Sequence, residues 1–154
     1  MAGVPDVEQA LRAYAQRGVF RGLDVKQSRG ATEFALQWVG DTPVRLRCET
    51  RQRLLTLRHL LPDVKQRSAF YADLQAFVAQ RLSGELPSHR SIKAKALDVQ
   101  WKLDRGRASL VFKVKNGDYA YAVNRVVNLT HELFVHLNES WAEYMWQHFG
   151  ASSE

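Results

Sequence analysis

Apolar residues recur along this chain at two spacings, one typical of helices and the other typical of strands. Three stretches place an apolar residue every three or four positions, which predicts amphipathic helices over about residues 7–17, 66–82 and 119–149. Between these stretches apolar and polar residues alternate, which predicts strands. The predicted order is α-β-β-β-α-β-β-α. It favours a single α+β domain over residues 1–154, in which helices pack on an antiparallel sheet. It argues against parallel nucleotide-binding folds, where strand and helix alternate singly.

The alternation is regular in four segments, which predicts strands over residues 34–38, 44–48, 97–103 and 108–115. A turn at Asp104–Arg107 joins the last two of them into a predicted hairpin. Residues 54–61 form an apolar run that fits either a strand or a short helix. Pro62 ends this run, and its length favours a third strand before the middle helix. A segment around Leu23–Gln27 is a candidate for a further strand at the edge of the sheet.

The C-terminal helical stretch can be read in two ways. Asn138 and Ser140 are both good N-caps, so residues 119–149 form either one long helix or two shorter ones. Residues 119–123 also fit the continuation of a strand, and we favour a helix there.

Composition narrows the class of protein. The chain has 154 residues, of which 45% are hydrophobic and 25% charged, which is typical of a globular domain that buries a core. It contains no apolar run of the roughly 18 residues that a membrane span needs, and its N-terminus lacks a signal-peptide pattern. Its one cysteine cannot form an internal disulfide. We therefore expect a soluble protein of the reducing cytoplasm, without a membrane partner.

Charge is unevenly distributed along the chain. Residues 1–125 hold all 22 Lys and Arg and 12 of the 16 acidic residues, whereas residues 126–154 hold the other four acids and neither Lys nor Arg. If the apolar strand positions face the core, six basic residues share the opposite face: Arg45, Arg47, Arg58, Lys102, Lys113 and Lys115. This face is either an ordinary solvated surface, which we favour, or an anion-binding surface. The strand aromatics alternate onto the other face, away from these charges, so a nucleic-acid partner is not favoured.

Few residues suggest catalysis. His131 and His136 lie in a segment that resembles a zinc-protease motif, but they are five positions apart, about 140° around a helix. Two histidines that share a metal on one helix need a spacing of four. Cys48 alternates in phase with the apolar residues of its strand, which predicts a buried position. A catalytic pair of Cys48 with His59 or His131 stays open, although nothing in the spacing favours it. We predict neither a metal nor another cofactor.

The end of the chain is rich in aromatic residues. Their side chains cover roughly 200° of a helix surface, whereas packing against one core needs only about half of that. Either the domain wraps this helix, or part of the helix contacts another subunit. The candidate interface residues are Trp141, Tyr144, Met145, Trp146 and Phe149.

The element order resembles that of the YbjN-like proteins and of the type III secretion chaperones that share their fold. The resemblance covers Asp6 to Phe149. It rests on Leu54–Val64, which leads into the middle helix, and on the Trp101–Val114 hairpin, which leads into Val126–Phe149. It implies a non-enzymatic and often dimeric protein, and the secretion chaperones bind an unfolded stretch of a client protein. These chaperones are generally acidic, whereas this chain has a net charge of +6.

We therefore expect a non-enzymatic binding or adaptor protein, or a chaperone-like protein, that acts through protein–protein contacts and forms a homodimer. Two other functions stay open. One is the binding of nucleic acid or another polyanion through the basic face. The other is an enzyme that uses His131, His136 or Cys48.

Overall fold

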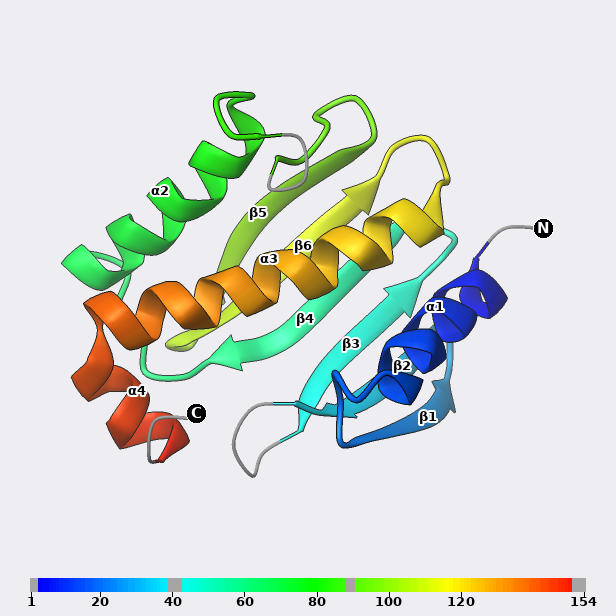
Figure 1. The fold of residues 1–154 in the computed structure, drawn as a ribbon, viewed down its shortest axis with the longest axis horizontal. Helices are drawn as coiled ribbons and strands as arrows, with labels where there is room; N and C mark the ends of the chain where they lie inside the picture. Colours follow the sequence, from blue (N-terminus) through cyan, green and yellow to red (C-terminus); the bar gives the residue numbers. More distant parts are fainter. Residues whose placement is uncertain (1–2, 39–42, 88–90, 151–154) are drawn as a thin grey trace.

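The computed structural model describes residues 3–38, 43–87 and 91–150, and these residues form four helices and six strands (Figure 1). In chain order the elements are α1 (Val4–Gln16), β1 (Gly22–Ser28), β2 (Ala31–Gln37), β3 (Val44–Glu49), β4 (Leu54–Leu61), α2 (Ala69–Leu82), β5 (Leu97–Asp104), β6 (Arg107–Val114), α3 (Tyr119–Ser140) and α4 (Ala142–Phe149).

The strands form one six-stranded sheet in the order β1-β2-β3-β4-β6-β5, and every neighbouring pair is antiparallel. The predicted α+β fold, with helices packed on an antiparallel sheet, is therefore confirmed. The chain contains one strand and one helix more than the predicted order. The candidate edge segment forms β1, and the C-terminal stretch forms two helices.

Two segments with ambiguous patterns are now assigned. Residues 54–61 form β4, as the preferred interpretation predicted. Residues 119–123 begin α3 rather than extending a strand. The side chain of Asp118 caps this helix, because its Oδ1 atom accepts a hydrogen bond from the backbone N–H of Tyr121 at 3.0 Å.

One face of the sheet is covered by helices (Figure 1). The long helix α3 runs across the sheet, α1 lies beside it, and α2 borders β5. The Asn124 amide donates to the Tyr14 hydroxyl at 2.9 Å and so joins α3 to α1. The Trp101 indole N–H donates to the Leu74 carbonyl oxygen at 2.8 Å and joins β5 to α2. None of the described helices is both long enough and apolar enough to cross a membrane.

The C-terminal stretch breaks at Trp141, after Asn138 and Ser140, the two predicted caps. Trp141 leaves helical geometry with φ −135° and ψ 49°. Its indole N–H donates to Oδ2 of Asp73 on α2 at 2.8 Å, and its ring packs edge-on against Phe70 with 4.9 Å between centroids. The break between α3 and α4 therefore coincides with contacts between Trp141 and the distant helix α2. We attribute its position to these contacts rather than to capping by Asn138 or Ser140.

Candidate functional site

The face of the sheet that points away from the helices is the candidate functional site, and we call it the open face. Its side chains alternate along each strand with the buried ones. The strand register aligns them in rows: Arg47 is opposite Glu33 and Thr56, and Val111 is opposite Thr56 and Gln100. The charged residues of the open face are Asp24, Lys26, Glu33, Arg45, Arg47, Glu49, Arg58, Asp98, Lys102, Asp104, Arg107 and Lys113.

The structure brings most of the predicted basic residues together on this face. They are Arg45, Arg47, Arg58, Lys102 and Lys113. Lys115 is placed differently, because β6 ends before it and its ammonium group donates to the Ala94 carbonyl oxygen at 2.8 Å. The prediction named only basic residues, although the same alternation assigns Glu33, Asp98 and Asp104 to this face. The open face is therefore mixed in charge, with basic residues in excess.

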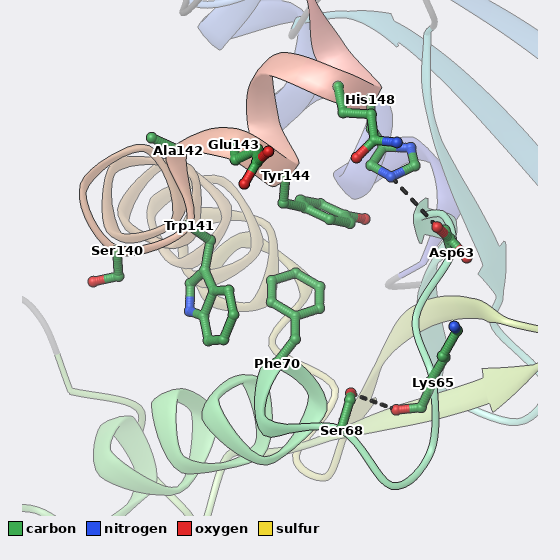
Figure 2. Close-up of a pocket in the computed structure, with 11 residues that line it drawn as sticks. Asp63, Lys65, Ser68, Phe70, Ser140, Trp141, Ala142, Glu143, Tyr144 and His148 are labelled. Atoms are coloured by element: carbon green, nitrogen blue, oxygen red, sulfur yellow. Dashed lines mark hydrogen bonds and ion pairs between the residues drawn. The ribbon is translucent and has the colours of Figure 1, made fainter.

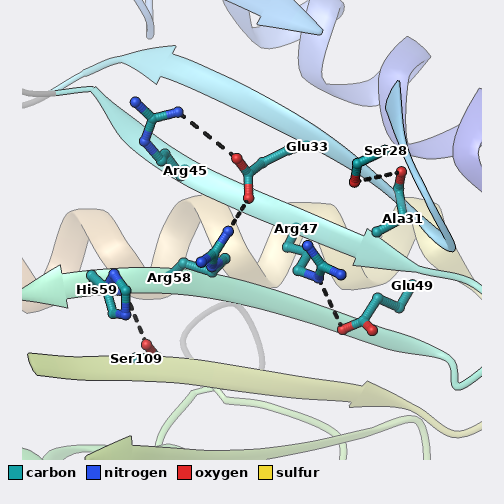
Figure 3. A network of polar contacts seen from close by, with 9 residues as sticks. All are labelled: Ser28, Ala31, Glu33, Arg45, Arg47, Glu49, Arg58, His59 and Ser109. Carbon is teal, nitrogen blue, oxygen red and sulfur yellow. Dashed lines mark hydrogen bonds and ion pairs between the residues drawn. The ribbon is translucent and has the colours of Figure 1, made fainter. Parts of the chain in front are cut away.

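Glu33 occupies the centre of a group of basic side chains (Figure 3). Arg45 and Arg58 lie directly opposite each other on β3 and β4, a position in which like charges repel. Oε2 of Glu33 accepts a hydrogen bond from Nη1 of Arg58 at 2.7 Å, and Oε1 lies 3.8 Å from Nη1 of Arg45. Lys26 and Arg47 are the cross-strand neighbours of Glu33. The Glu33 side chain is 15% exposed, so one largely buried carboxylate reduces the repulsion between the two arginines without removing it.

Replacing Glu33 by glutamine should therefore lower the free energy of unfolding by about 2 kcal/mol, because the repulsion between Arg45 and Arg58 is then uncompensated. The loss should shrink as salt concentration rises. Urea denaturation measures it. Glu8→Gln is the matched control, because Glu8 pairs with Arg12 on the exposed surface of α1 and should change stability by less than about 0.5 kcal/mol. Equal effects of the two substitutions would contradict the role given to Glu33.

A concavity of about 760 Å³ lies on the open face, lined by side chains from β3, β4, β5 and β6. Thr56 and Val111, which are cross-strand neighbours, are two of its uncharged residues, and the others include Gln52, Leu54, Gln100, Trp101 and Ser109. Arg58, Lys102 and Lys113 are among the basic side chains around them. The concavity therefore combines apolar, hydroxyl and charged groups on a regular strand scaffold.

A β-bulge in β4 borders this concavity. The register between β4 and β6 shifts between Leu57 and Leu61, and His59 takes a left-handed backbone conformation with φ 51°. The backbone N–H of His59 donates to Oγ of the buried Ser109 at 2.9 Å. Such a conformation costs a histidine on the order of 1 kcal/mol. The bulge also explains the sequence pattern, because it lets the consecutive residues Leu60 and Leu61 both be buried.

Cys48 is buried on the helix side of the sheet, as its alternation predicted. Burial, and to a smaller extent the charge of Glu49, raises the pKa of the Cys48 thiol to about 11. The thiol is therefore protonated at neutral pH, which disfavours a nucleophilic role. His59 is exposed on the open face and His131 is exposed on α3. Neither of the two predicted partners is brought to Cys48.

His131 and His136 occupy different surroundings on α3. His131 is exposed, whereas Nε2 of His136 lies 2.6 Å from Oδ2 of Asp73 on α2, and its ring stacks on Phe77. Burial alone would raise the pKa of Asp73, but hydrogen bonds from His136 and Trp141, together with the charge of His136, lower it below the ordinary value. In the described part of the chain, no three His, Cys, Asp or Glu side chains are grouped so that they could hold a metal ion.

Most of the candidate interface residues near the C-terminus pack within the chain itself. They are Trp141, Tyr144, Met145 and Phe149. The Tyr144 hydroxyl donates to the Pro62 carbonyl oxygen at 2.5 Å, and burial raises the pKa of Tyr144. Trp141 and Tyr144 also line a shallow pocket of about 440 Å³ with residues of α2 and α4 (Figure 2). Trp146 is different, because 64% of its surface is exposed.

Comparisons with protein-family models, with curated proteins and with solved structures find no match to this chain.

Proposed function

We propose that this protein is a non-enzymatic binding protein, of adaptor or chaperone-like type, that holds a segment of a partner protein on the open face. The observation that carries the proposal is the concavity of about 760 Å³ on a sheet face that the helices do not cover. Its lining mixes charged, hydroxyl and aliphatic side chains, and arginine is enriched at protein interfaces.

The scaffold beneath this face supports the same proposal. Side chains on the other face of the sheet, such as Phe34, Leu46 and Phe112, are fully buried under the helices. A strand that slipped by one residue would expose this core, so the register is fixed. The backbone that carries the open-face side chains is thereby held in place before a partner arrives, which lowers the entropic cost of binding.

The resemblance to YbjN-like proteins and type III secretion chaperones supports the proposal as well. The resemblance was based on the expected element order, and the observed order has one more strand, β1, and one more helix, α4. We infer from this likeness that the partner segment is bound in an unfolded or extended form. The unpaired Cys48 suits a reducing compartment, and we propose the cytoplasm as the site of action.

A peptide selection with two matched variants tests this proposal. Peptides are selected from a displayed random library on the wild-type protein, and their affinities are then measured for Val111→Trp and Val135→Trp. Val111 lines the concavity, whereas Val135 is exposed on α3, on the helix side of the sheet. The added ring at Val111 should fill part of the concavity and weaken binding by about tenfold or more, and the ring at Val135 should change little. Selected peptides that bind both variants as tightly as wild type would rule out the open face.

We also propose that two copies of the chain associate through α4. Trp146 supports this, because it is a large aromatic side chain that the chain's own core does not bury. The contact would be smaller than the five-residue interface expected from the sequence, since the other four residues pack internally.

A further inference from the structure

The open face breaks a local rule of sheet stability at one place. Arg45 and Arg58 are cross-strand partners, and like charges in that position destabilise a sheet. Glu33 reduces the cost, but one carboxylate does not balance two guanidinium groups. Places where a sequence departs from a local rule without an evident structural gain are candidates for function.

The excess positive charge continues across the sheet. Lys102 on β5 lies opposite Ser109 and makes no ion pair with any described residue, and the acid two residues along its strand, Asp104, lies opposite Arg107. We call Arg45, Arg58 and Lys102 the cationic row. The remaining basic residues of β3 and β6 on the open face each have an acid beside or opposite them: Arg47 with Glu49, Lys113 with Asp98, and Arg107 with Asp104. The uncompensated positive charge of the open face therefore lies in the cationic row, where a partner can contact it.

We propose that the cationic row binds an acidic segment of a protein partner. This inference rests on the proposed function and names the chemistry that the partner supplies. Carboxylates of such a segment would pair with the guanidinium groups of Arg45 and Arg58 and with the Lys102 ammonium group. Arg45 and Arg58 are well placed for this, because their side chains are 52% and 40% exposed despite the contact with Glu33. Opposite charges also speed the encounter of the two molecules.

The same face fits a polypeptide better than a nucleic acid. A phosphate backbone carries a negative charge at every nucleotide and would meet the carboxylates of Glu49, Asp98 and Asp104 along with the basic residues. Single-strand binders also place aromatic rings among their basic residues for stacking on bases. Trp101 is among the residues that line the concavity, but its indole N–H is directed to α2, where it donates to the Leu74 carbonyl oxygen. An acidic peptide can space its charges to match the cationic row.

Fluorescence anisotropy with a labelled peptide in which glutamate alternates with serine tests the proposal. The variant is Arg45→Gln/Lys102→Gln, which leaves Glu33 paired with Arg58 so that the sheet stays intact. The matched control is Arg67→Gln/Lys95→Gln, which removes the same net charge at exposed positions in loops. Wild type and control should bind the peptide alike, and the variant should bind about tenfold more weakly. Added salt should weaken wild-type binding more than variant binding. Circular dichroism confirms that all three are folded.

Each other outcome overturns a defined part of the argument. If the variant and the control bind the peptide equally weakly, net charge alone attracts the peptide. This result would rule out the cationic row as the binding site. Tighter binding of a single-stranded oligothymidine than of the peptide would assign the cationic row to nucleic acid. A third outcome is that the acidic peptide does not bind, while neutral or basic peptides bind the wild-type protein and bind Val111→Trp more weakly. This result would overturn the inference about acidic segments and leave the proposed function standing. If the Val111→Trp substitution weakens the binding of no peptide, both this inference and the proposed function are overturned.

Discussion

Replacing Met145 by lysine should lower the free energy of unfolding by about 3 kcal/mol or more, whereas the same substitution at its neighbour Trp146 should change it by less than about 0.5 kcal/mol. Met145 is 3% exposed and belongs to the core, so a lysine there must either bury a charge or force α4 off the domain. Trp146 is 64% exposed and points to solvent, so a lysine there stays hydrated. Urea denaturation followed by circular dichroism measures both values, at a protein concentration low enough that any dimer is dissociated.

The same pair of variants tests the proposed dimer. Sedimentation of Trp146→Lys should show a monomer that keeps its fold, because a charge in the contact resists burial. A wild-type protein that is monomeric at high concentration would end the dimer proposal. Strong destabilisation of the monomer by Trp146→Lys would contradict the exposed position that the structure gives this residue.

Replacing Glu132 by leucine should cost about 3 kcal/mol of stability, because it leaves the buried guanidinium group of Arg81 without its carboxylate. Nη2 of Arg81 donates to Oε1 of Glu132 at 2.7 Å and joins the end of α2 to α3. Arg81 is 5% exposed, and its guanidinium carbon lies 3.8 Å from the centroid of the Phe77 ring. The Arg81 side chain therefore has little access to water.

The double variant Arg81→Met/Glu132→Leu is the decisive control. It removes both charges and keeps apolar contact with Phe77, so its stability should return to within about 1 kcal/mol of wild type. Urea denaturation of both variants gives the coupling between the two residues. A double variant as unstable as the single one would show that Arg81 contributes more through its shape and its hydrogen bond to Gln80 than through its charge.

The common face of the basic residues could be predicted because a strand has a period of two. Once residues 44–48 and 97–103 are assigned as strands, Arg45 and Lys102 must point away from the core, and the structure places them there. The link between Arg45, Arg58 and Glu33 could not be predicted in the same way. It depends on the register of three strands, which is set by the packing of the whole sheet.

Other features depend on contacts between distant parts of the chain. The break between α3 and α4 lies at Trp141, which binds Asp73 on another helix, and a local reading of caps cannot find such a partner. The bulge at His59 has no local signal either, because histidine seldom takes a positive φ. The burial of Met145 beside the exposed Trp146 follows from how α4 folds back on the core. The edge strand β1 gave a weak pattern, since its side chains are exposed or only half-buried.

The strand order also has a consequence for folding. The first four strands pair in sequence, and the last two form a hairpin, so all six strands can find a neighbour through local contacts. The pairing of β4 with β6 joins these two halves across the segment that holds α2, and contacts between distant residues form late because a long loop must first be closed. Arg45 and Arg58 belong to the first half and Lys102 to the second. We therefore expect the cationic row to be completed only when the halves join, so that a chain caught midway through folding presents only part of the proposed binding surface.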